Sequence, residues 1–196
     1  MKLKYVSGMK IRNTIDADFG VIGSNKIYSY IPKNEIWFDR LYKEEKEHFL
    51  KIHLYELKLI KEMRYEKARK IIEKRFIVKG KIPDFVVKKT KYKGFSVVYV
   101  DGRIIREYLD PKFILGCNGI LNKKIWKNKI LNKKIWKRDI WIDIRQDKRE
   151  YKYTLIHEYE EAKLIMQGMN YNDAHDYAIA AEKAARRKDG ARYLKD

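Results

Sequence analysis

One short stretch of the chain, His157-Glu158-Tyr159-Glu160-Glu161, combines residue types that bind metals and transfer protons. On a helix, His157 and Glu161 are four residues apart and project from one face, so both can reach a single ion. Glu158 lies about 100° further round the helix, where it can act as general base on water that the ion polarises. The order resembles the H-E-x-x-H motif of zinc peptidases, with glutamate replacing the second histidine. The segment predicts a divalent metal site with zinc as the first candidate, and the carboxylate also admits manganese or iron.

A third ligand is expected from His175, which follows a predicted turn at Gly168-Met169-Asn170. An antiparallel pair of helices would bring His175 back towards His157 and Glu161. Glu182, seven residues after His175 and on the same helix face, is expected to orient the imidazole or to replace it as a ligand. The competing interpretation is that His157 and Glu161 form an ordinary i,i+4 charge pair. Convergence of the three side chains to within about 4–5 Å would favour the metal site, because such ligands bind an ion at about 2.0–2.2 Å.

Two helices must position these residues. The first is predicted over about Tyr151–Gln167 and ends at Gly168, because glycine readily adopts the left-handed conformation that closes a helix. The second is predicted from Asn170, whose side chain can cap the first turn, to about Arg187. Together they predict a helical hairpin with the candidate ligands on its inner side.

Strands are expected ahead of this hairpin. Phe95–Val100 is rich in β-branched and aromatic residues, Asp101-Gly102 is a turn signal, and a further β-branched stretch lies around Ile135–Ile144. The first part of the chain repeats the helical pattern over about Lys43–Glu62 and Tyr65–Phe76. The predicted fold class is α+β.

The chain also resembles itself. Four ordered blocks match at offsets of 94 to 106 residues: Lys10–Phe19 with Ile104–Phe113, Asn34–Asp39 with Arg138–Asp143, His53–Glu56 with His157–Glu160, and Met63–Ala68 with Met169–Ala174. Ile120–Lys127 recurs unchanged at Ile130–Lys137, which explains the change of offset. We predict a tandem duplication of a small sheet followed by a two-helix hairpin, forming an intramolecular pseudo-dimer. Its parts are a first repeat (1–80), a basic connector (81–95) and a second repeat (96–196) that holds a duplicated Lys/Trp insert (120–137).

The first repeat lacks most of the candidate site. His53 and Glu56 match the motif, but Leu54 and Leu57 replace two of its carboxylates, and Arg69 takes the place of the second-helix histidine. The first repeat is therefore expected to be degenerate.

Two sets of motifs together resemble a family of uncharacterised bacterial and bacteriophage proteins. The first repeat carries Ile31-Pro32-Lys33-Asn34-Glu35-Ile36-Trp37, and the second carries His157-Glu158-x-x-Glu161 followed by Ala174-His175. The resemblance covers most of both repeats and implies a phage- or mobile-element-linked protein that is virus-encoded and metal-binding. The motif helix is similar to that of zincin metallopeptidases, so the expected function is a zincin-like metal-binding protein with metal-dependent hydrolysis of peptidase type as its candidate activity.

A net charge of +19, from 46 basic and 27 acidic residues, favours contact with polyanions such as DNA or RNA. The insert brings lysines together with two tryptophans, a combination typical of nucleic-acid binding. Its candidate contact residues are Lys123, Lys124, Trp126, Lys133, Lys134 and Trp136. The alternative function is a non-enzymatic nucleic-acid-binding or virion-associated structural protein.

The composition excludes several other classes of protein. Hydrophobic residues make up 45% of the chain and there are three Pro and ten Gly, which argues against a disordered or fibrous chain. A single cysteine, Cys117, cannot form an intramolecular disulfide. Because no apolar run approaches the length of a signal segment or a membrane span, we expect an intracellular, cytoplasmic protein with no membrane partner.

Overall fold

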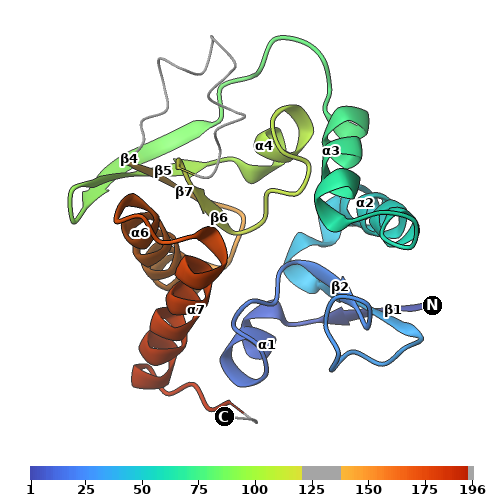
Figure 1. Ribbon diagram of the computed structural model, residues 1–196, viewed down its shortest axis with the longest axis horizontal. Helices are drawn as coiled ribbons and strands as arrows, with labels where there is room; N and C mark the ends of the chain where they lie inside the picture. The colour runs from blue at the N-terminus through green and yellow to red at the C-terminus, as the bar shows by residue number, and fades with distance from the viewer. Residues whose placement is uncertain (121–137, 194–196) are drawn as a thin grey trace.

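The computed structural model describes residues 1–120 and 138–193, which form two small mixed β-sheets and six α-helices (Figure 1). The class is α+β, as the sequence predicts. None of the helices among the described residues is long and apolar enough to cross a membrane. The residues predicted to contact nucleic acid lie outside the described ranges: Lys123, Lys124, Trp126, Lys133, Lys134 and Trp136.

The first half of the chain builds a three-stranded sheet from β1 (Lys2–Val6), β2 (Ile22–Ser24) and β3 (Glu35–Asp39). β3 lies in the middle, parallel to β1 and antiparallel to β2. Parallel neighbours need a crossover connection, and α1 (Gly8–Thr14) lies within it. The Ser7 hydroxyl caps the first turn of α1, which fixes where the helix begins.

A helical hairpin follows the first sheet. The 3-10 segment η1 (Arg40–Glu45) leads into α2 (Lys46–Leu59), and α3 (Tyr65–Phe76) packs back against it. Apolar side chains from both helices are buried between them: Ile52, Leu59, Ala68 and Ile72. α3 has the predicted bounds, whereas α2 starts later than predicted because η1 occupies its expected first turn.

The second half builds a four-stranded sheet in the order β4-β5-β7-β6. Its strands are β4 (Val86–Tyr92), β5 (Phe95–Val100), β6 (Gly116–Asn118) and β7 (Asp139–Asp143). β5 and β7 are parallel, and the edge strands β4 and β6 run antiparallel to their neighbours. β4 falls within the segment 81–95, which therefore contributes a strand to this sheet.

The connection between β5 and β7 begins with α4 (Gly102–Tyr108). Asp101-Gly102, expected as a turn, instead starts this helix, because the Asp101 carboxylate accepts a hydrogen bond from the Arg103 N–H. The Gly102 N–H donates to the Asp143 carboxylate at 3.0 Å, and a Cβ on Gly102 would lie only 2.1 Å from that carboxylate. Glycine is required at this position because the helix begins directly against a buried acidic side chain.

The second helical hairpin consists of α6 (Tyr151–Met166), preceded by the 3-10 segment η2 (Lys148–Glu150), and α7 (Tyr171–Lys188). Gly168 follows α6 with a φ of 96°, in the left-handed region that favours glycine. The Asn170 side chain accepts a hydrogen bond from the Asp173 N–H and caps α7, as predicted. The bounds of both helices lie within one residue of the prediction.

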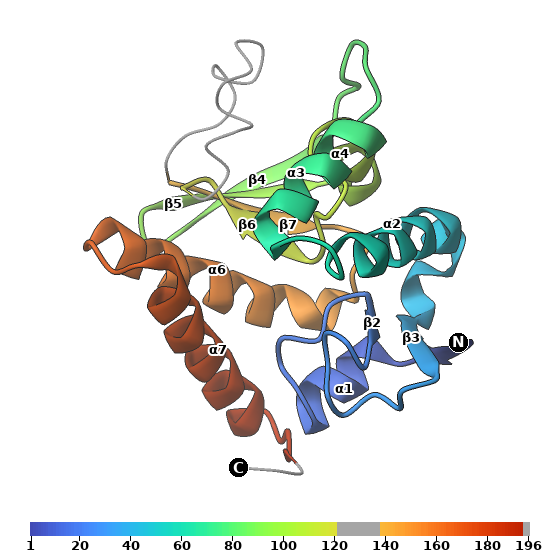
Figure 2. The ribbon, with the colours of Figure 1, turned by 45° about the vertical axis from the view of Figure 1, so that its right-hand side comes forward.

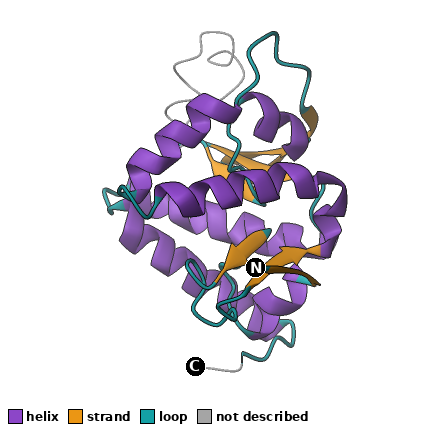
Figure 3. Ribbon diagram, turned by 90° about the vertical axis from the view of Figure 1, so that its right-hand side faces the viewer, coloured by secondary structure: helices purple, strands orange, loops and turns teal. Residues whose placement is uncertain are grey.

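The second sheet is covered on both faces. α6 runs along one face (Figure 2), where its Ala162 is buried against Ile140 and Ile142 of β7. On the other face, Val98 and Trp141 pack with Ile105 of α4. Figure 3 shows the two sheets as separate groups of strands with helices between and around them. The hairpin that carries the candidate ligands is therefore anchored on a core of its own.

Two buried arginines connect the halves. Arg106 of α4 donates two hydrogen bonds of 2.8 Å to Glu45, at the end of η1. Arg12 of α1 donates to Glu150, at the end of η2, at 2.6 Å. Each arginine also pairs with the aspartate that ends the central strand of its own sheet. Both halves are thus fastened by reciprocal ion pairs in the interior.

Candidate metal centre

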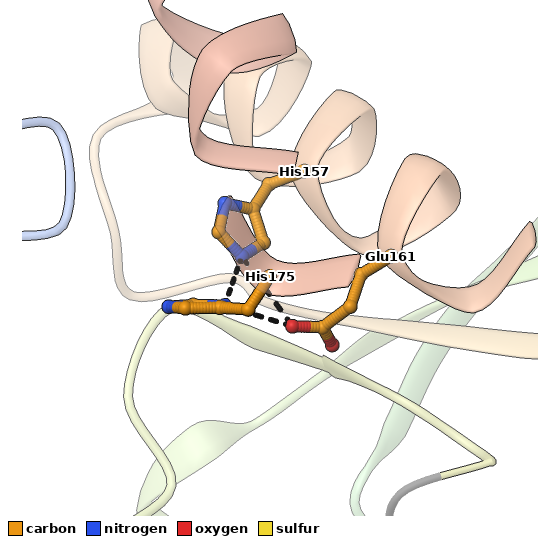
Figure 4. Close-up of side chains that lie close together, drawn as sticks. All are labelled: His157, Glu161 and His175. Atoms are coloured by element: carbon orange, nitrogen blue, oxygen red, sulfur yellow. Dashed lines mark hydrogen bonds and ion pairs between the residues drawn. The ribbon is translucent and has the colours of Figure 1, made fainter. Parts of the chain in front are cut away.

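Three predicted ligands from the second hairpin lie together. His157 and Glu161 come from α6 and His175 comes from α7, and their side chains point towards one another (Figure 4). The His175 Nδ1 atom lies 2.8 Å from Glu161 Oε2 and 3.2 Å from His157 Nε2. His157 Nε2 and Glu161 Oε2 are 3.9 Å apart. All three candidate ligand atoms lie within 4.8 Å of one another, which agrees with the separation expected from the sequence for a shared ion.

Each imidazole is held by a carboxylate on its outer side. Glu182 Oε2 lies 2.9 Å from His157 Nδ1, and Asp18 Oδ1 lies 3.5 Å from His175 Nε2. A carboxylate accepts a hydrogen bond from a ring N–H, and in the neutral imidazole it therefore favours the tautomer whose other nitrogen carries the lone pair. With an ion bound, the coordinating nitrogens would be His157 Nε2 and His175 Nδ1, which both lie near Glu161. Glu182, expected beside His175, contacts His157 instead.

Asn118 joins the two motif carboxylates. Its Nδ2 group donates to Glu161 Oε1 at 2.6 Å and to Glu158 Oε2 at 3.2 Å. Asn118 is fully buried at the end of β6, the edge strand against which α6 packs. It therefore fixes the direction of both carboxylates from the sheet side.

Burial and the neighbouring carboxylates shift the proton affinities of the site. Burial, together with the charge of Glu161, raises the pKa of Glu158 to about 7. Interactions with Asp18 and then Glu161 raise the pKa of His175 to about 10. Burial lowers the pKa of His157, but the hydrogen bond with Glu182 and the charge of Glu158 outweigh it and raise the pKa overall. A concentration of negative charge around two imidazoles is an environment that attracts a cation.

The three candidate ligand atoms are close enough together for one divalent ion to contact all of them. Ligand atoms of a tetrahedral zinc site, with bonds of about 2.0–2.2 Å, are about 3.3–3.6 Å apart. Of the observed separations, 2.8 and 3.2 Å are hydrogen-bond distances below that range and 3.9 Å lies above it, so the side chains would shift by a few tenths of an ångström to bind an ion. Two imidazole nitrogens and one carboxylate oxygen form a donor set that zinc accepts, with one position left for water or substrate.

The corresponding part of the first hairpin contains different side chains. The Nζ group of Lys112 donates to Glu56 and, at 2.8 Å, to the Tyr65 hydroxyl. His53 is buried, and burial lowers its pKa to about 4. Arg69 pairs with an aspartate at 3.1 Å. A lysine ammonium therefore neutralises the buried glutamate of this hairpin.

The sequence singled out the five residues that the structure brings together in the two helices, but Asn118 and Asp18 were missed. Asn118 ends a three-residue strand, and no spacing relates it to the motif helix. Asp18 comes from the other half of the chain, far from the motif in sequence. Tyr171, the first residue of α7, was also missed, and its ring stacks on His175 with centroids 5.5 Å apart.

Comparison with models of known protein families, with curated proteins and with solved structures finds no match for this chain.

Proposed function

We propose that the protein is a zincin-like metal-binding protein and a metal-dependent hydrolase of peptidase type. His157 Nε2, His175 Nδ1 and a Glu161 oxygen would hold one divalent ion, zinc first, with manganese or iron as the alternatives. The observation that carries the proposal is the pair of outer carboxylates. Because Glu182 and Asp18 contact the far nitrogen of each imidazole, both near nitrogens are directed at the same point as Glu161.

Glu158 is the candidate general base. When bound, the ion would act as a Lewis acid on a substrate carbonyl and lower the pKa of water. A carboxylate with a pKa of about 7 can accept a proton from the attacking water and return it to the leaving amine near neutral pH. Asn118 holds Glu158 beside Glu161, at the edge of the site. The raised pKa of Glu158 and its shared partner Asn118 support this role.

We also propose that the two halves arose by tandem duplication, so that the molecule is an intramolecular pseudo-dimer. The arrangement β1-β3-β2 has the same order and strand directions as β5-β7-β6, and a helical hairpin follows each. Counted from Glu45 and Glu150, which directly precede α2 and α6, Glu56 corresponds to Glu161 and His53 to Glu158. This register differs by one residue from the match between His53 and His157 in the sequence. It leaves the first half with one site carboxylate and no ligand histidine.

Metal content tests the proposal. Protein expressed with supplementary zinc should contain one equivalent by elemental analysis, and alanine at His157, Glu161 or His175 should abolish it. His48→Ala, which removes a histidine of α2 outside the site, is the matched control and should retain the metal. Full-length protein that takes up no transition metal, and whose thermal stability zinc does not change, would refute the proposal.

A second candidate is a basic nucleic-acid-binding or virion-associated protein. It is favoured by the net charge of +19 and by exposed lysines on the edge strand β4: Lys88, Lys89 and Lys91. Affinity for single-stranded DNA or RNA should fall steeply with salt concentration. Charge reversal at Lys123, Lys124, Lys133 and Lys134 should weaken it further, and binding that is indifferent to salt would exclude this candidate.

A further inference from the structure

The loop between α1 and β2 brings a carboxylate of the first half to the candidate metal centre of the second. We propose that Asp18 is a positioning residue for His175, so that the metal centre is completed across the two halves of the molecule. The inference rests on the proposed metal site and assigns it a component that the motif helix does not contain. Asp18 Oδ1 lies 3.5 Å from His175 Nε2, on the side of the ring opposite Glu161.

The loop holds Asp18 in place by contacts on both sides of its backbone. The Asp18 N–H donates to the Asp16 carboxylate at 3.0 Å, and its carbonyl accepts from the Tyr28 hydroxyl at 3.2 Å. The next residue, Phe19, is fully buried, and its carbonyl accepts from Arg12 at 2.9 Å. The Asp18 side chain itself is accessible, with 52% of its surface exposed. The backbone therefore presents this carboxylate to α7, while its replacement would leave no cavity in the core.

The equivalent loop of the second half makes the reciprocal contact. Lys112 corresponds to Asp18 in the repeat, because the two residues are related by the same offset of 94 that relates Arg12 to Arg106. Lys112 reaches back to the first hairpin and donates to Glu56 and to the Tyr65 hydroxyl. Each hairpin is thus completed by one loop side chain from the other half, although the two side chains have opposite charges.

The sign of that charge agrees with the different residues of the two hairpins. A carboxylate at position 18 stabilises the N–H on the far side of His175 and leaves Nδ1 free to bind a cation. The Lys112 ammonium donates a hydrogen bond to Glu56, so the positive charge beside this carboxylate comes from the protein itself. The loop residue therefore complements the hairpin that it contacts: Asp18 faces a ligand histidine of the second hairpin, whereas Lys112 neutralises Glu56 of the first.

Zinc affinity of the full chain, measured by competition with a chromophoric chelator, tests the role of Asp18. Asp18→Ala should weaken zinc binding about 10–100-fold, the usual cost of removing an outer carboxylate from a ligand histidine. It should also change the visible absorption of the cobalt-substituted protein, because the imidazole is no longer held in one orientation. Asp18→Glu, which keeps a carboxylate, should restore most of the affinity and the spectrum.

Asp176→Ala is the matched control, since it removes the same charge from an exposed residue of α7 adjacent to His175 in sequence. It should leave affinity and spectrum close to those of the unmodified protein. If the unmodified protein binds zinc and Asp18→Ala binds it equally well with the same cobalt spectrum, the inference is wrong while the metal site stands. Equal losses in Asp18→Ala and Asp176→Ala would also overturn it, because the effect would then be general electrostatics. Absence of zinc binding in the unmodified protein would refute the proposed function itself.

Discussion

Arg106 offers the sharpest test of how the two halves are held together. Its side chain is 1% exposed, and its guanidinium donates to Glu45 twice, to Asp143 and to the Phe113 carbonyl. Arg106→Met keeps an unbranched apolar stem but removes the positive charge and all four hydrogen bonds. Asp143 would keep two backbone donors, the N–H groups of Gly102 and Arg145. Among the described residues, Glu45 would keep one cationic partner, Arg145 at 4.0 Å.

The expected loss of folding stability follows from the poorly compensated charge of Glu45 in Arg106→Met. Breaking a buried ion pair from one side typically costs about 3–5 kcal/mol, because one charge remains buried and unpaired. For a chain of this size, each kcal/mol corresponds to about 2–4 °C in Tm, so the melting temperature should fall by about 6–20 °C. In Arg106→Met/Glu45→Gln no unpaired carboxylate remains at position 45. The double variant should therefore lose less stability than the sum of the single variants, by about 0.5–3 kcal/mol.

Urea unfolding followed by circular dichroism measures these differences. Arg103→Met is the matched control, because Arg103 is exposed on the same helix and undergoes the same substitution. A loss in Arg106→Met below about 1 kcal/mol, or no larger than in Arg103→Met, would refute the view that this buried pair fastens the halves. Additive effects in the double variant would equally show that Arg106 and Glu45 do not interact energetically.

Three further predictions concern the site and its counterpart. Zinc at 100 times its Kd should stabilise the protein by about 2.7 kcal/mol, a rise of about 5–11 °C in Tm that calorimetry would detect and that His157→Ala should abolish. Glu158→Gln should retain the metal yet lower the rate of peptide hydrolysis about 10²–10⁴-fold, and a variant that keeps full activity would exclude Glu158 as general base. The pKa of His53 is about 4 in the folded protein and about 6.5 when unfolded, so the unfolded chain binds more protons between these values. The folding stability should therefore fall as pH drops from about 6.5 to about 4. Urea midpoints measured across this range should fall less for His53→Gln than for the unmodified protein. Equal dependence of the two midpoints on pH would contradict the lowered pKa of His53.

Local features of the sequence predicted the second hairpin well. The strand Phe95–Val100, the glycine after α6 and the Asn170 cap depend on interactions among residues close in sequence, and all are found as predicted. The convergence of His175 on His157 was also predictable, since a short turn between two helices permits only a few ways of packing them.

Other local patterns were ambiguous by themselves. Asp101-Gly102 begins a helix where a turn was expected, because the decisive contact is with Asp143, which is distant in sequence. The lysine-rich segment around β4 forms an edge strand, since pairing with β5 satisfies its backbone while its lysines remain exposed. In both places a long-range contact determined the local conformation.

The sequence by itself determined the chemistry available at the second hairpin. One helix carries a histidine and two carboxylates, and the next helix, after a short turn, carries a second histidine. Only the tertiary structure decided what completes that chemistry. Asn118 arrives from a sheet edge and Asp18 from the other half, at sequence separations where no periodicity operates. The reciprocal arginine pairs likewise join residues far apart in the chain. Burial makes such contacts strong, because an unpaired charge in the interior is costly, but their partners are determined only when both halves have folded and packed together.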